Sequence, residues 1–271
     1  AHASNITSNS ASNGGAFYLN ATGWGENTKF VLGSSLNGNS ALQNGGAIYV
    51  EGNLTLEGTL SFANNTAVNN GGALYVTGSF TAKDTANVTF NGNSSTKGNG
   101  GALYAEGAAA LNGTSKFSGN TAAKGNGGAI YANGTLSIKN GTFTHNKATN
   151  GGAIYANAGL SLTSGAFREN SALKGNGGAI YIAADTTAMI GNETGSVSIT
   201  DNSALNGGAI YNAGTLIIGK YLDNLSNNSA LYESEKKIGG KGGAIYNSGT
   251  LTITGDNKNL SAINITGNKS T

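Results

Sequence analysis

The sequence predicts an all-β fold: a single right-handed parallel β-helix, or β-solenoid, of about nine to ten coils with three short strands per coil. The first observation is a repeated word, Asn-Gly-Gly-Ala-(Ile/Leu/Phe)-Tyr, which occurs eight times and a ninth time with Lys in place of Asn. Its glycine pairs lie 24 to 35 residues apart, a period typical of solenoids. The second observation is composition, with 45 glycines and no proline. Since proline removes a donor from a strand ladder, its absence suits a long uninterrupted sheet.

Three apolar words in each repeat alternate with period two, which predicts strands rather than helices. The second residue after the glycine pair is always Phe, Ile or Leu and should face the core, with the neighbouring Ala and Tyr facing outward. These inward residues are Phe17, Ile48, Leu74, Leu103, Ile130, Ile154, Ile180, Ile210 and Ile245. The third word is apolar-x-apolar, as in Leu54 and Leu56.

The second word of the repeat is apolar-x-x-Asn, as in "FSGN" at 117 to 120. Equivalent residues of a β-helix stack in columns about 4.8 Å apart. We therefore expect an inner aromatic column and a ladder of asparagine amides that satisfies the backbone of a corner. The aromatic column should contain Phe62, Phe90, Phe117, Phe143 and Phe167.

Glycines at the head of a strand allow a positive φ or a close approach of two backbones, so the glycine pair should form a corner in every coil. Residues 1–271 then form one β-helical segment, in which departures from the period are surface loops. Three such insertion loops are predicted, at 20–28, 183–198 and 231–241.

Composition excludes several function classes. Charged residues make up 10% of the chain and the net charge is +2, so we expect no nucleic-acid partner. The chain has no cysteine. Its acids are scattered, and the closest group in register, Asp185, Glu193 and Asp201, spreads over about one coil. With His145 isolated beside a ladder asparagine, we predict no enzyme activity, no metal site and no cofactor.

The outward tyrosines form the most notable candidate site. An aromatic row can bind sugars or a protein partner, and the same row also stabilises any sheet by cross-strand packing, so both interpretations stay open. An ice-binding threonine array is disfavoured because the matching outward positions, such as Ala110 and Ile217, are irregular. The predicted binding residues combine this column with side chains of two loops: Tyr49, Tyr75, Tyr104, Tyr131, Tyr155, Tyr181, Trp24, Lys236 and Lys237.

The paired words "GGA(I/L)" and "FxxN" resemble those of the chlamydial polymorphic membrane proteins and similar autotransporters. The resemblance covers residues 6 to 268, and in one coil it falls on Gly127 to Ile130 and on Phe117 and Asn120. It implies a β-helical passenger at the bacterial cell surface or outer membrane, or secreted, that adheres to a host-cell protein or glycan receptor. Contact with a membrane would be made only through a C-terminal β-barrel translocator, which these residues do not include.

A second interpretation is a structural stalk or a self-assembling extracellular filament. A solenoid needs polar caps, and neither end of this sequence has a helix-like or charge-rich cover. We therefore expect further coils beside this segment, or self-association end to end.

Overall fold

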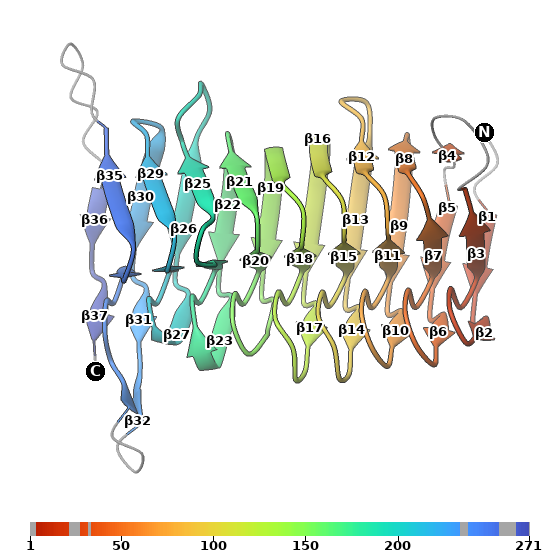
Figure 1. Cartoon of the computed structure of the whole chain (residues 1–271), viewed down its shortest axis with the longest axis horizontal. Coiled ribbons are helices and arrows are strands. Elements are labelled where there is room, and N and C mark those ends of the chain that lie inside the picture. The colour runs from red at the N-terminus through yellow and green to blue at the C-terminus, as the bar shows by residue number, and fades with distance from the viewer. Residues whose placement is uncertain (1–3, 22–27, 32–33, 234–237, 255–263, 271) are drawn as a thin grey trace.

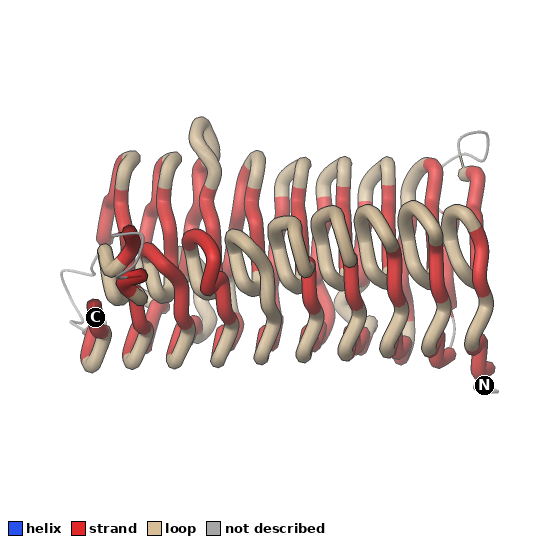
Figure 2. The backbone as a smooth tube through the Cα atoms, turned by 90° about the horizontal axis from the view of Figure 1, so that it is seen from below, coloured by secondary structure: helices blue, strands red, loops and turns tan. Residues whose placement is uncertain are grey.

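The chain folds as a parallel β-solenoid, as predicted. The computed structural model describes residues 4–21, 28–31, 34–233, 238–254 and 264–270, and these form strands and turns with no helix among them. Successive turns stack along one axis like rungs, so that the chain starts at one end of the stack and finishes at the other (Figures 1 and 2). None of the described residues belongs to a helix that could cross a membrane.

The strands that follow the glycine pairs form one nine-stranded sheet, which we call the tyrosine sheet. All its neighbours are parallel and in register, with Tyr75 opposite Tyr104 and Tyr104 opposite Tyr131. Nine strands delimit eight complete turns, so the predicted nine to ten coils were slightly too many. The strands are β3 (Phe17–Asn20), β7 (Ile48–Glu51), β11 (Leu74–Val76), β15 (Leu103–Ala105), β18 (Ile130–Ala132), β20 (Ile154–Ala156), β24 (Ile180–Ile182), β28 (Ile210–Asn212) and β34 (Ile245–Asn247).

The other two words of each repeat share a 17-stranded sheet, the wide sheet. In two turns the two words join into one long strand, β16 or β19. The strands are β1 (Ser4–Thr7), β4 (Thr28–Val31), β5 (Ser34–Asn37), β8 (Leu54–Glu57), β9 (Thr59–Ala63), β12 (Phe80–Ala82), β13 (Asn87–Asn91), β16 (Ala109–Ser118), β19 (Leu136–Thr144), β21 (Gly159–Leu162), β22 (Gly165–Arg168), β25 (Thr187–Ile190), β26 (Val197–Thr200), β29 (Thr215–Ile218), β30 (Leu222–Ser226), β35 (Thr250–Ile253) and β36 (Asn264–Thr266).

A further short strand follows the ladder asparagine and was not predicted. It forms the short sheet, in two blocks of five and four strands. The blocks contain β2 (Ser10–Ala11), β6 (Ser40–Ala41), β10 (Thr66–Ala67), β14 (Ser94–Ser95) and β17 (Thr121–Ala122), then β23 (Ser171–Asn176), β27 (Ser203–Asn206), β31 (Ser229–Ala230) and β37 (Lys269–Ser270). Lys147 links the blocks as an isolated bridge to Thr121 and Ser171.

The core is a set of stacked columns that run along the axis. Ile154 and its equivalents from Ile48 to Ile210 are fully buried, and Phe17 and Ile245 at the two ends are partly buried. The phenylalanines from Phe62 to Phe167 are at most 1% exposed, with ring centroids 4.6–4.9 Å apart. Both predicted core columns are confirmed.

The alanine of the repeated word faces the core, so its predicted outward position was wrong. Ala129, for example, is 0% exposed. The backbone bends there, because the amides of Ala129 and Ile130 both donate to the carbonyl of Ala153, at 2.9 and 3.0 Å. Strand alternation therefore starts at Ile130, one residue later than the sequence pattern indicated.

The two glycines of each corner are required for different reasons. Gly127 has a φ of 66°, where a side chain is strained, and a Cβ there would lie 2.2 Å from the carbonyl oxygen of Ile130. A Cβ on Gly128 would lie 2.1 Å from the carbonyl oxygen of Gly152 in the next turn. The first glycine makes the turn and the second lets neighbouring turns touch.

The asparagine ladder is confirmed, and it is fully buried from Asn39 to Asn228. Asn120 accepts at Oδ1 from the backbone amide and the side-chain amide of Asn93, both at 3.0 Å. Its own Nδ2 donates to the carbonyl of Phe90 and to Asn146 Oδ1, each at 3.0 Å. Because every rung repeats this pattern, the buried amides are satisfied by the turns on either side.

The three predicted insertion loops have different outcomes. Residues 22–27 of the first loop lie outside the described residues. The segment 183–198 includes β25 and the start of β26, so much of it is sheet, with a projecting turn at 191–196 (Figure 1). In 231–241, β32 (Tyr232–Glu233) pairs antiparallel with β33 (Ile238–Gly239).

Candidate binding surface

The nine tyrosines of the repeated word form one continuous column on the outer face of the tyrosine sheet. From Tyr18 to Tyr246, neighbouring ring centroids lie 4.6–5.1 Å apart and the ring planes differ by 0–14°. The in-register pairing of the parallel strands places each ring over the equivalent ring of the next turn. Such stacking contributes about 0.5–1.5 kcal/mol per pair beyond area burial.

Stacking decides which part of each ring a partner can reach. Tyr18, at one end of the column, is 50% exposed, whereas Tyr75 within it is 9% exposed. Each interior ring has both faces covered by its neighbours. A sugar therefore cannot stack on an interior ring, and only the edge that carries the hydroxyl is available for contact.

The hydroxyls differ along the column. Near the N-terminal end, Tyr18 donates to the carboxylate of Glu51 and Tyr75 donates to that of Glu106. Further along, none of the hydroxyls from Tyr104 to Tyr246 has a hydrogen-bond partner among the described residues. The four in the middle of the column are called the hydroxyl row: Tyr104, Tyr131, Tyr155 and Tyr181. Beside this row, Asn157 donates to Asn133 Oδ1 at 2.9 Å. The middle of the column is thus neutral and offers hydroxyl and amide groups.

Burial keeps these hydroxyls protonated. It raises the pKa of Tyr104 and of Tyr155 to about 12, with smaller contributions from Glu106 at Tyr104 and from neighbouring tyrosines at both. Burial also raises the pKa of Tyr131 and Tyr181 above the ordinary value. At neutral pH every member of the hydroxyl row can both donate and accept a hydrogen bond.

The residue two places after a tyrosine of the column is the sequence signal that separates carboxylate-bonded hydroxyls from the hydroxyl row. This signal was overlooked in the sequence analysis. These positions read Glu51, Thr77, Glu106, Asn133 and Asn157 along the column. Strand alternation places them on the same outer face as the tyrosines. The sequence shows where the acids are, but only the structure shows which tyrosine reaches across to which carboxylate.

The other predicted site residues are not brought to this column. Trp24, Lys236 and Lys237 lie outside the described residues. Of the scattered acids, Asp201 Oδ2 lies 3.6 Å from Arg168 Nε, and Glu193 Oε2 accepts from the Thr163 hydroxyl at 3.5 Å. In the part of the chain that the structure describes, no three or more His, Asp or Glu side chains meet as a metal site would require.

A second charged group occupies a corner of the wide sheet. His145 contacts the carboxylate of Glu169, and Arg168 Nη2 lies 3.0 Å from Glu169 Oε1. His145, Glu169 and Asp201 all have positive φ, between 56° and 59°. Their side chains project from the turn and stay partly or largely exposed, so this is a surface ion-pair network.

Comparison with known families assigns the repeat. The Chlamydia polymorphic membrane protein repeat matches eight segments that together cover more than half of the chain. The chain belongs to this family. The matched residues are 33–51, 59–77, 87–106, 114–133, 140–157, 164–183, 196–213 and 224–248.

Each matched segment of the polymorphic membrane protein repeat contains a ladder asparagine and the glycine pair that precedes Ala-(Ile/Leu)-Tyr. The matched segments thus coincide with the residues that form each turn of the solenoid. The family is one of surface-exposed outer-membrane proteins. No curated protein and no solved structure matches the chain.

Proposed function

We propose that this chain is a non-enzymatic adhesive passenger segment of a bacterial surface protein, and that it binds a host-cell or other surface receptor through the hydroxyl row. Its family and its solenoid fold support a surface-exposed passenger. The observation that carries the binding proposal is the row of four unpaired, protonated hydroxyls, fixed on one outer face by stacked rings.

The geometry suits a partner with a repeating array of polar groups. A single hydrogen bond contributes only about 0.5–1.5 kcal/mol net, so a useful affinity requires several rungs to act together. A rigid column supplies them without loss of side-chain entropy on binding. The receptor would be a protein or a glycan that lies along the column and presents carbonyl or hydroxyl oxygens.

The cellular location of the segment is part of the same proposal. We place the segment at the cell surface or outer membrane, or in a secreted form, with no nucleic acid as partner. Any contact with the membrane would be made by a translocator encoded elsewhere in the protein. Surface labelling of intact bacteria with an antibody against this segment tests the location, and signal only after lysis would contradict it.

The direct test of adhesion compares two matched variants. One replaces all four tyrosines of the hydroxyl row by phenylalanine, and the control carries Tyr18→Phe and Tyr75→Phe, whose hydroxyls already bond to carboxylates. Binding to host cells and to a glycan array should fall for the first variant and stay near the wild-type level for the control. Equal binding by all three proteins would refute the role of the row.

The absence of catalysis is tested separately. Polysaccharide cleavage should be undetectable with or without calcium. Reproducible turnover that disappears in Asp201→Asn or Glu193→Gln would show that the protein is an enzyme.

A structural stalk or a self-assembling extracellular filament is the alternative function. Sedimentation at several concentrations distinguishes the cases, because a self-assembling segment grows with concentration and a monomer does not.

A further inference from the structure

Four lysines lie on one edge of the solenoid, between the ladder asparagines and the glycine pairs, within or directly after the short sheet. Lys97, Lys124 and Lys174 each belong to the word Lys-Gly-Asn before the glycine pair, and Lys147 lies in the turn between the last two. All four are exposed. We call them the lysine edge.

The turns that carry the lysine edge are in direct contact. A Cβ built on Gly125 would lie only 2.0 Å from the carbonyl oxygen of Gly98 in the preceding turn. In the following turn, Thr149 N donates to the Gly125 carbonyl at 2.8 Å. Neighbouring turns therefore follow each other at the strand spacing of about 4.8 Å. Lys97 and Lys124 are therefore one turn apart and Lys174 lies two turns beyond Lys124, while Lys147 in the turn between them is paired with Thr121 and Ser171.

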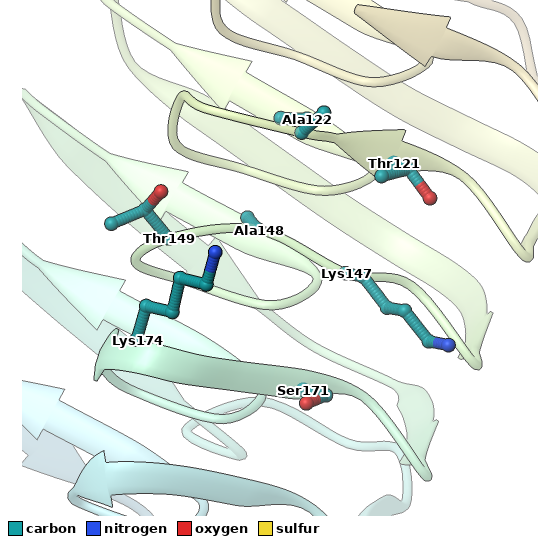
Figure 3. A pocket seen from close by; sticks show the side chains of 8 residues that line it. Thr121, Ala122, Lys147, Ala148, Thr149, Ser171 and Lys174 are labelled. Atoms are coloured by element: carbon teal, nitrogen blue, oxygen red, sulfur yellow. The ribbon is translucent and has the colours of Figure 1, made fainter. Parts of the chain in front are cut away.

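The turn of Lys147 is shorter than its neighbours and leaves a notch. Four residues separate the ladder asparagine from the glycine pair there, against six in 121–126 and six in 171–176. The notch has a volume of about 170 Å³, and its lining includes the hydroxyl-bearing Thr149 and Ser171. Lys174 points toward the turn of Thr149, whereas Lys147 points away from Lys174 (Figure 3).

The charge on this edge is not neutralised by the protein. The segments 94–99, 121–126, 147–150 and 171–176 contain no Asp or Glu. None of the four lysines has an ion pair among the described residues, whereas Lys83 pairs with Glu57 and Lys139 with Asp84. Glu51 and Glu106 lie at the opposite end of the tyrosine-sheet strands. A net charge of only +2 therefore conceals a basic edge.

We propose that the lysine edge binds a linear sulfated polysaccharide, laid along the axis with sulfates near the ammonium groups of Lys97, Lys124 and Lys174 and one sugar residue in the notch that Lys147 helps to line. This inference goes beyond the proposed function, because the lysine edge and the hydroxyl row consist of different residues. The turns follow one another at the strand spacing of about 4.8 Å, so only an extended chain that runs along the axis can reach lysines in several turns. The hydroxyls of Thr149 and Ser171 can bond to the sugar in the notch.

The same edge is a poor fit for nucleic acid. Proteins that bind single strands combine basic grooves with aromatic side chains on which bases stack. The four turns contain no aromatic residue, and neither does the lining of the notch. The tyrosine rings are covered by one another, so they offer no stacking platform either.

The test uses size-defined heparin oligosaccharides as the probe and measures affinity by calorimetry or surface plasmon resonance. One variant replaces Lys97, Lys124, Lys147 and Lys174 by Gln. The matched control replaces Lys83, Lys116, Lys139 and Lys220 by Gln and changes the net charge equally. We expect at least about tenfold weaker binding for the first variant and less than about twofold for the control, with a shallower salt dependence for the first.

Three results would overturn the proposal: no binding of heparin by the wild-type protein, an equal loss in both variants, or tighter binding of a single-stranded DNA of matched charge. Adhesion to host cells with and without sulfated glycans separates this proposal from the proposed function. If the wild type adheres equally to both kinds of cell, adhesion stands and the sulfated ligand is wrong. If heparin binds through the lysine edge but no cell is bound, adhesion is wrong and the site stands.

Discussion

The solenoid contains two aromatic columns, phenylalanines inside the wide sheet and tyrosines outside the tyrosine sheet. Their ring spacings are nearly equal, 4.6–4.9 Å for phenylalanine and 4.6–5.1 Å for tyrosine. Both columns arise because parallel strands in register place identical residues on neighbouring rungs. Stacking by itself therefore says nothing about function.

The columns differ in what surrounds the rings. The phenylalanines are enclosed on all sides, whereas each interior tyrosine has covered faces and an accessible hydroxyl edge. The phenylalanine column should hold the fold together, and the tyrosine hydroxyls should be dispensable for folding and available for binding. The following changes measure that contrast.

The largest effect is expected for Phe143→Ala. It removes a fully buried ring from between Phe117 and Phe167, and such truncations cost about 3–5 kcal/mol in the free energy of unfolding. Guanidinium unfolding followed by circular dichroism measures it. Phe143→Leu is the control and should cost less than Phe143→Ala, because it retains more of the buried apolar volume. A cost for Phe143→Ala below that of Tyr155→Ala would contradict the division between the columns.

Adjacent residues of β20 allow the same comparison within one strand. Ile154→Ala should lower the free energy of unfolding by about 2–4 kcal/mol, because Ile154 is 0% exposed. Tyr155→Ala loses two stacked contacts of about 0.5–1.5 kcal/mol each and creates no internal cavity, so it should cost less. The reverse order would mean that the strand is placed inside out.

Alkaline pH should weaken the fold through the tyrosine column. Tyr104 and Tyr155 have a pKa of about 12 in the folded chain, while an unfolded tyrosine titrates near 10. Between about pH 10 and pH 12 the unfolded chain has lost these protons and the folded chain retains them, so stability falls as the pH rises. Below about pH 10 the tyrosines contribute no pH dependence.

Unfolding measured between pH 8 and pH 12, with phenolate absorbance recorded in parallel, tests this dependence. In the Tyr104→Phe/Tyr155→Phe variant the decline above about pH 10 should be smaller. An unchanged decline would assign the effect to other groups.

The smallest effect on stability is expected for Tyr131→Phe combined with Tyr155→Phe. The rings and their stacking remain, and the hydroxyls that are removed have no partner among the described residues. The free energy of unfolding should change by no more than about 0.5 kcal/mol, as for other surface changes. A larger loss would show that these hydroxyls support the fold and would weaken their assignment to binding.

Much of the candidate surface could be predicted from the sequence, because the alternation of inward and outward residues along a strand and the length of the repeat are both visible in the chain itself. Nine tyrosines one place after nine core residues can only form an outward column once the turns stack. The lysine edge was overlooked because its charges are spread over four repeats, although the word Lys-Gly-Asn occurs three times. The notch beside them depends on unequal turn lengths, whose effect appears only when turns lie side by side.

The sequence by itself determined the parallel solenoid, the buried Ile and Phe columns and the asparagine ladder, since each follows from a residue that recurs at one position of every repeat. Tertiary structure decided what happens between turns. Ala129 faces the core because the carbonyl of Ala153, 24 residues away, accepts two successive amides and bends the backbone. Tyr75 donates to Glu106, whereas the Tyr131 hydroxyl has no partner among the described residues, because the groups within reach of a tyrosine are set by the next turn and not by its own.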